Sequence, residues 1–306
     1  MTTESNDISR KLNLEMKLIR GGEVEHTETI RTESPQQVLR SVDGIADMAR
    51  RQYPPANQCI YCGETTGLSK EHIVPYGLNG TSTIQKASCS DCAAVTGDFE
   101  RRVLRGPMRS VRLLHGFQSR RKHEGASRTQ MIEIEKDGKM SAIEVPIDEM
   151  PILLFFPEFT PPWCLTGKTG KGIDMTGVAV VHFGPSPEEF AKSIGADSVR
   201  SESPPMEPAA FARLIAKIGY AHAFAEGALD QLEVSNAVVP AILGQEGIGQ
   251  WVGTLGGPYP KYPGVLHRVA LRVHKEAHLF MAEVQLFASS AAPAYGMVLG
   301  MLKTAT

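Results

Sequence analysis

The sequence predicts an α+β fold in which a small cysteine-bearing unit is inserted between an N-terminal hairpin-helix segment and a larger mixed α+β body. Three observations lead to this prediction: short runs of alternating apolar and polar residues, segments that begin with helix-capping sequences, and two CxxC pairs. We place the three parts at residues 1–55, 56–123 and 124–306. A chain of 306 residues is long for one simple domain, which favours a small module beside a larger body.

The N-terminal part is expected to form a hairpin followed by a helix. Residues 14–31 alternate apolar and polar side chains around a Gly-Gly pair, which is typical of a β-hairpin. A helix is then predicted from Ser34, because serine caps a helix and the proline that follows it suits the first helical position.

Composition limits where the chain works and what it binds. No apolar run approaches the roughly 18 residues that a membrane span needs. The polar N-terminus also lacks the apolar core of a signal peptide. We therefore expect a cytoplasmic protein without membrane contact. The formal net charge of −2 means that any surface for nucleic acid must be local.

Four of the five cysteines form two pairs with the spacing of a metal site. In a reducing compartment this spacing favours a metal ion over disulfides, and four thiolates form a closed tetrahedral site for structural zinc. Disulfides and free reduced thiols are the alternatives. The predicted ligands are Cys59, Cys62, Cys89 and Cys92, whereas Cys164 stands alone and is expected to be a partly buried apolar residue.

The 26 residues between the two pairs are more than a simple zinc ribbon requires. They contain one strand, "KEHIVP", then a turn rich in Gly and Asn, and then a second strand that leads into Cys89. After Cys92, apolar residues return at helical spacing at Val95, Phe99 and Val103. The unit is therefore predicted to be a β-hairpin followed by a helix, with zinc holding its ends together.

The stretch from Cys59 to about Arg105 resembles the HNH endonuclease family, in its branch with two CxxC pairs. The residues that carry the resemblance are "CIYC", "EHIVP", the turn "GLNG", and "ASCSDC" at the start of a helix. The resemblance implies a ββα-metal core that cuts nucleic-acid backbones with one divalent cation. It covers this stretch only, and the rest of the chain adds nothing to it.

By this resemblance His72 is the general base and Glu71 binds a catalytic magnesium or manganese ion. The chemistry agrees, because a neutral imidazole can activate water and these cations prefer oxygen ligands. Strand neighbours point to opposite faces, so both side chains reach one phosphate only if the strand is distorted. The alternative for this Glu-His step is an exposed charged pair on an edge strand.

Two departures from the family pattern bear on activity. The asparagine that the family carries on the second strand is absent from "STIQKAS", and the residue after the last cysteine differs. Family members usually carry Asn or His directly after the last cysteine, as a second ligand of the catalytic cation, but here this residue is Ala93. Glu100 lies two helical turns further on and is the candidate to replace it; the alternative is that it pairs with a neighbouring arginine. A catalytically inactive zinc-stapled module that binds nucleic acid or acts as a scaffold is therefore the second hypothesis.

A basic stretch follows directly, with eight Lys or Arg against two acidic residues between Asp98 and Lys122. Such clusters neutralise phosphates without reading sequence. We therefore expect nucleic acid, double-stranded DNA in particular, as the partner; a merely solvated surface is the alternative, and Pro107 interrupts a continuous helix. The predicted phosphate contacts are Arg101, Arg102, Arg105, Arg109 and Arg112.

The body contributes strands and helices but no candidate site. We expect a hairpin around Asp137-Gly138 and a capped helix from Ser186. A longer apolar helix is expected from about 208 to 227, and a second hairpin over 267–287. The sequence does not indicate what this body does, nor the oligomeric state.

Overall fold

A computed structural model describes the two N-terminal strands and residues 51–117, 128–200, 204–274 and 277–303. The chain divides into two units, 1–40 and 41–306, and each is described by itself. In the first unit β1 (Leu12–Arg20) and β2 (Glu23–Thr32) pair antiparallel, as the alternating pattern predicts. The helix predicted from Ser34 lies outside the described residues.

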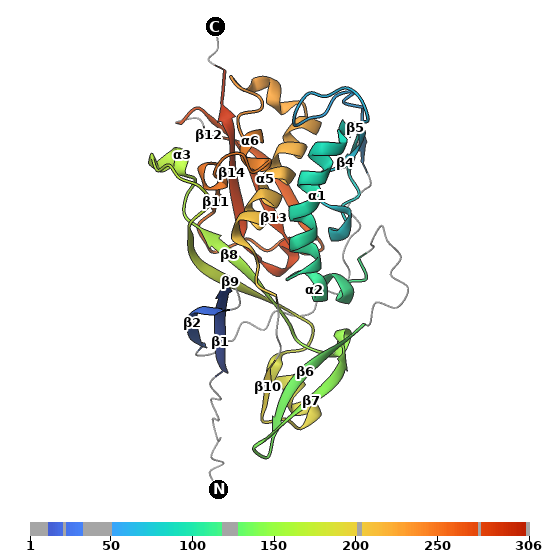
Figure 1. The fold of residues 1–306 in the computed structure, drawn as a ribbon, viewed down its shortest axis with the longest axis vertical. Coiled ribbons are helices and arrows are strands. Elements are labelled where there is room, and N and C mark those ends of the chain that lie inside the picture. The colour runs from blue at the N-terminus through green and yellow to red at the C-terminus, as the bar shows by residue number, and fades with distance from the viewer. Residues whose placement is uncertain are drawn as a thin grey trace. The chain divides into compact units, whose positions relative to one another are not determined.

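The second unit confirms the α+β class (Figure 1). Its sheets have the strand orders β3-β5-β4, β10-β6-β7, β8-β9 and β11-β14-β13-β12. The strands are β3 (Gln52–Tyr53), β4 (Ser69–His72), β5 (Thr83–Ser88), β6 (Thr129–Lys136), β7 (Lys139–Pro146), β8 (Ile152–Phe159), β9 (Met175–Phe183), β10 (Ser198–Arg200), β11 (Val252–Thr254), β12 (His267–His274), β13 (Leu279–Leu286) and β14 (Ala294–Met301). The helices are α1 (Ser90–Arg105), α2 (Arg109–Leu114), α3 (Trp163–Thr166), α4 (Pro187–Ile194), α5 (Pro208–Ala225) and α6 (Val239–Ile242).

The cysteine-bearing unit has the predicted order of strand, turn, strand and helix: β4, β5 and α1. The turn is tight, because a Cβ at Gly80 would lie 1.9 Å from the carbonyl oxygen of Val74, so only glycine fits there. Helix α1 begins at Ser90, before the last cysteine rather than after it as we expected. The helix starts earlier because Cys89 caps it, its sulfur accepting a hydrogen bond from the Cys92 amide.

Helix α5 connects this unit to the large sheet. It contacts α1, β12, β13 and β14 (Figure 1), and twelve of its 18 residues are buried while none is exposed. Gly219 allows the close approach to the sheet, since a Cβ there would lie 2.8 Å from the Met297 sulfur. Lys217 is two residues away, about 200° around the helix, and faces the cysteine-bearing unit instead.

His267 makes a second connection between the cysteine-bearing unit and the body, at the turn between β4 and β5. Its Nε2 donates to the Leu78 carbonyl at 2.8 Å, and its Nδ1 accepts from the Phe287 amide at 3.2 Å. Burial lowers the pKa of His267 to about 4, so the ring is neutral, as this pair of bonds requires. The contacts of α5 and of His267 together position the hairpin that carries Glu71 and His72 against the body.

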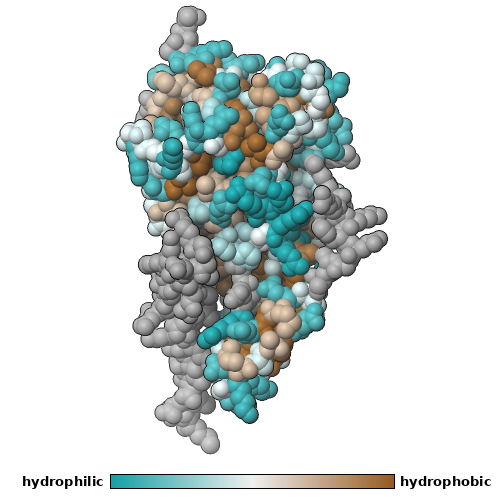
Figure 2. Space-filling model, in the orientation of Figure 1, coloured by the Kyte–Doolittle hydropathy of each residue, from teal (hydrophilic) through white to brown (hydrophobic). Residues whose placement is uncertain are grey.

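The cysteine-bearing unit and the body share one hydrophobic core within residues 41–306. On the face drawn in Figure 2, hydrophobic residues form small groups between hydrophilic ones. None of the helices in the described ranges combines the length and the apolar content that a membrane span requires. The boundaries predicted after residues 55 and 123, and the cytoplasmic location, stay predictions.

Candidate zinc centre and the Lys217 cluster

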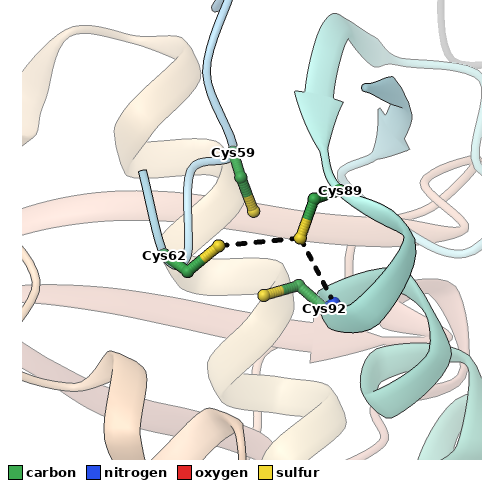
Figure 3. A group of neighbouring side chains, drawn as sticks. All are labelled: Cys59, Cys62, Cys89 and Cys92. Carbon is green, nitrogen blue, oxygen red and sulfur yellow. Dashed lines mark hydrogen bonds between the residues drawn. The ribbon is translucent and has the colours of Figure 1, made fainter. Parts of the chain in front are cut away.

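The four paired cysteines come together at one point, as their spacing predicts (Figure 3). Their sulfur atoms lie within 4.8 Å of one another, and all but Cys62 are buried. Cys59 and Cys62 come from the loop that follows β3, while Cys89 and Cys92 come from the end of β5 and the first turn of α1. Cys164 is exposed and lies outside this group.

The spacing of the sulfur atoms fits a tetrahedral zinc ion. Four thiolates at about 2.3 Å from a central ion stand about 3.8 Å apart. The sulfur atoms of Cys62 and Cys89 are 3.6 Å apart. A site with four protein ligands has no open position for water, so zinc here would join the loop, the strand and the helix without doing chemistry.

Strand β4 is irregular at the residues for which catalysis was predicted. Ser69 pairs with Ser88, but Glu71 pairs with Ile84, so the partner strand advances by four residues while β4 advances by two. Lys86, in the extra length, has a positive φ of 46°. The adjacent Glu71 and His72, which follow this irregularity, are both buried, at 7% and 8% exposed.

Glu71 and Glu100 converge, as their predicted roles require, but they converge on the ammonium group of Lys217. The Lys217 Nζ lies 2.6 Å from Glu71 Oε1 and 3.1 Å from Glu100 Oε1. It also donates to the backbone carbonyl of His72 and, at 3.4 Å, to that of Ile73. Four oxygens therefore surround one lysine ammonium that is fully buried.

The lysine is charged in this setting. Burial alone would lower the pKa of Lys217, but the charges of Glu100 and Glu71 outweigh burial and raise it above its ordinary value. The ammonium thus balances the two carboxylates, and a divalent cation does not fit between Glu71 and Glu100 while Lys217 is there. The residues present therefore do not fit the predicted magnesium or manganese ion.

Both the backbone and the side chain of His72 make contacts that fix its position. Its carbonyl is held by Lys217, and its ring lies 5.6 Å from the ring of Tyr76, measured between centroids. One helical turn along α5 from Lys217, the Tyr220 hydroxyl donates to the Ile60 carbonyl at 2.8 Å, inside the first CxxC loop. Helix α5 thus contacts both the loop that carries Cys59 and Cys62 and strand β4.

The five arginines predicted to contact phosphate differ in whether they bind groups within the chain. Arg101 and Arg102 both pair with Asp98, and Arg102 also pairs with Glu207 at 2.8 Å. The guanidinium of Arg112 donates to the carbonyls of Gly77 at 2.6 Å and Leu104 at 2.9 Å. Three of the five arginines therefore bind groups of the chain itself.

Two of the predicted arginines stay available for phosphate. Within the described ranges Arg105 and Arg109 are exposed and form no ion pair. The remaining basic residues of the stretch, Arg120, Arg121 and Lys122, lie outside the described residues.

Lys217 is the residue of this cluster that the sequence analysis missed. A signal was present, because it is a lone lysine on the apolar face of a helix, with Leu214, Tyr220 and Ala221 as neighbours at helical spacing. A lysine in such a place must be paired when buried. Its partners are about 120 and 150 residues away in the sequence, so spacing could not identify them.

Comparisons of the chain with models of protein families, with curated proteins and with solved structures find no match.

Proposed function

We propose that residues 59–105 act as a zinc-stapled structural unit of this protein, without a catalytic cation of their own. The observation that carries the proposal is the position of the Lys217 ammonium between Glu71 and Glu100. In this proposal the chain has the zinc-held framework of the HNH family that it resembles, but it does not hydrolyse nucleic acid.

The chemistry of phosphodiester cleavage supports this choice. A divalent cation must hold the scissile phosphate and stabilise the leaving oxygen. The ammonium of Lys217 is attached to α5 and is fully buried, so it neither exchanges with solvent ions nor reaches a phosphate. Ala93 offers no ligand, and Glu100, its candidate replacement, is engaged by the same lysine.

The role of a scaffold follows from the contacts between the unit and the body. Lys217 and Tyr220 bind β4 and the first CxxC loop, and His267 binds the turn between the strands. In this proposal zinc keeps the loop, β5 and α1 in one arrangement, so that the body packs on a rigid surface.

The second candidate is a metal-dependent HNH-type endonuclease acting on DNA. Two observations favour it: Glu71 and His72 are both buried next to a register shift in the strand pairing, and Glu100 meets Glu71 at the ammonium group of Lys217. In this candidate His72 is the general base, and Lys217 leaves its place when a cation binds. Arg105 and Arg109 would contact the DNA backbone.

Plasmid cleavage separates the two candidates. With supercoiled plasmid and magnesium or manganese, we expect the purified protein to nick no faster than its His72→Ala variant, because no catalytic cation is held. Zinc content is measured in both preparations to show that the unit is intact. Cutting by the wild-type protein that disappears in His72→Ala would reject the scaffold proposal and support the nuclease.

A further inference from the structure

The group of oxygens around Lys217 has the composition of a cation site. It combines two carboxylates, from Glu71 and Glu100, with two backbone carbonyls, from His72 and Ile73. Calcium is bound in proteins by this mixture of carboxylate and carbonyl oxygens, completed by water. An ammonium has only three N–H donors, so four oxygens are more than it needs.

A buried hydroxyl that is influenced by the charges of both carboxylates lacks a hydrogen-bond partner among the described residues. The Tyr61 side chain is 3% exposed, and among the described residues its hydroxyl makes no hydrogen bond. Burial first, and then the charges of Glu71 and Glu100, raise the pKa of Tyr61 well above its ordinary value, so the hydroxyl lies in the field of both carboxylates. A polar group left in this state is costly, and a hydrated cation would offer it a water.

The ammonium group of Lys217 occupies the place between the four oxygens. Lys217 enters from α5, whose position is fixed by the close packing of Gly219 on the sheet and by the Tyr220 hydrogen bond. Truncation of the lysine at Cβ removes its stem and its ammonium but leaves both fixed points of the helix. The oxygens then face an opening without a positive charge.

We propose that the oxygens of Glu71, Glu100, His72 and Ile73 form a divalent-cation site that this chain closes with its own lysine. Lys217 is then an internal substitute for the ion. The inference goes beyond the structural role proposed above, because it concerns the ligand chemistry of the cluster. It assigns no hydrolysis to the site.

Thermal unfolding of Lys217→Ala with and without calcium tests the inference. Calcium is the probe because it prefers oxygen ligands and does not compete for the cysteine thiolates. We expect saturating calcium to raise the Tm of Lys217→Ala on the order of 5 °C, since a ligand that binds only the folded state stabilises it. The wild-type protein is expected to show no shift.

Two matched variants control the experiment. Lys217→Met also removes the charge but keeps the opening filled, so calcium is expected to leave its Tm unchanged. Glu71→Gln added to Lys217→Ala removes one ligand charge and is expected to weaken calcium binding at least tenfold. Terbium emission sensitised by tyrosine is a second readout, expected from Lys217→Ala and reduced by Tyr61→Phe.

Three results would overturn the inference. They are a folded Lys217→Ala without a calcium shift, an equal shift in the wild-type protein, and a Lys217→Ala variant that stays unfolded even when refolded in calcium. Plasmid cleavage by the wild-type protein would reject the structural role instead, so the failures of the two proposals are distinguishable.

Discussion

Replacing Cys89 with serine is expected to release zinc and to lower the Tm of the protein by roughly 10 °C. Cys89 has two roles, since its sulfur belongs to the cysteine group and also caps α1 by accepting from the Cys92 amide. Its loss removes one of four ligands and frees the start of the helix that packs on α5. We expect the loss of stability to be on the order of 5 kcal/mol, because zinc binding contributes folding free energy directly.

The chain offers a matched control for this substitution. Cys164 is exposed and lies outside the group, so Cys164→Ser is expected to keep one zinc ion and an unchanged Tm. Metal analysis and thermal unfolding are measured on both variants and on the wild-type protein. If Cys89→Ser and Cys164→Ser behaved alike, zinc would not be what holds the unit together.

Breaking the charge cluster at Lys217 is the second change with a large expected effect. Lys217→Met leaves two carboxylates without their counter-charge, and Glu71→Gln leaves the buried ammonium with one carboxylate. Removal of one partner of a buried ion pair costs about 3–5 kcal/mol, and we expect each variant to lose stability on this scale. Chemical denaturation of both variants measures the loss.

The double variant shows whether the two residues act together. Because Lys217 and Glu71 are in direct contact, the loss in the double variant is expected to be clearly smaller than the sum of the single losses. Glu207→Gln is the matched control, since it removes an exposed partner of Arg102 and is expected to cost about 0–1 kcal/mol. Strictly additive losses at Lys217 and Glu71 would show that the contact does not stabilise the fold.

Patterns between residues close in the sequence predict most of the cysteine-bearing unit. Two CxxC pairs predict that their four cysteines form one metal-binding group, whatever the path of the chain between them. The alternating residues between the pairs predict the hairpin, and the helical spacing after the second pair predicts the helix. The same holds for α4, whose capping box at Ser186 and Glu189 is present as predicted. The hairpin over 267–287 is also found, as β12 and β13.

The partners of the charged residues could not be predicted, because they depend on long-range packing. The sequence pattern predicts roles for Glu71 and Glu100 but does not indicate that α5 inserts Lys217 between them. Arg112 looked like a surface cation, but its guanidinium is bound to backbone carbonyls of its own unit. Strands β11 and β14 were not predicted either, and β14 is buried almost throughout, so it lacks the alternation that marks an exposed strand.

The metal content of the wild-type protein tests the central claim most directly. After dialysis against zinc and excess manganese, followed by removal of free ions, elemental analysis counts the ions that each chain retains. With the cysteines holding zinc and Lys217 filling the place between the two carboxylates, we expect one zinc and no manganese per chain. A manganese ion that is retained by the wild-type protein and lost in Glu71→Gln would contradict the account.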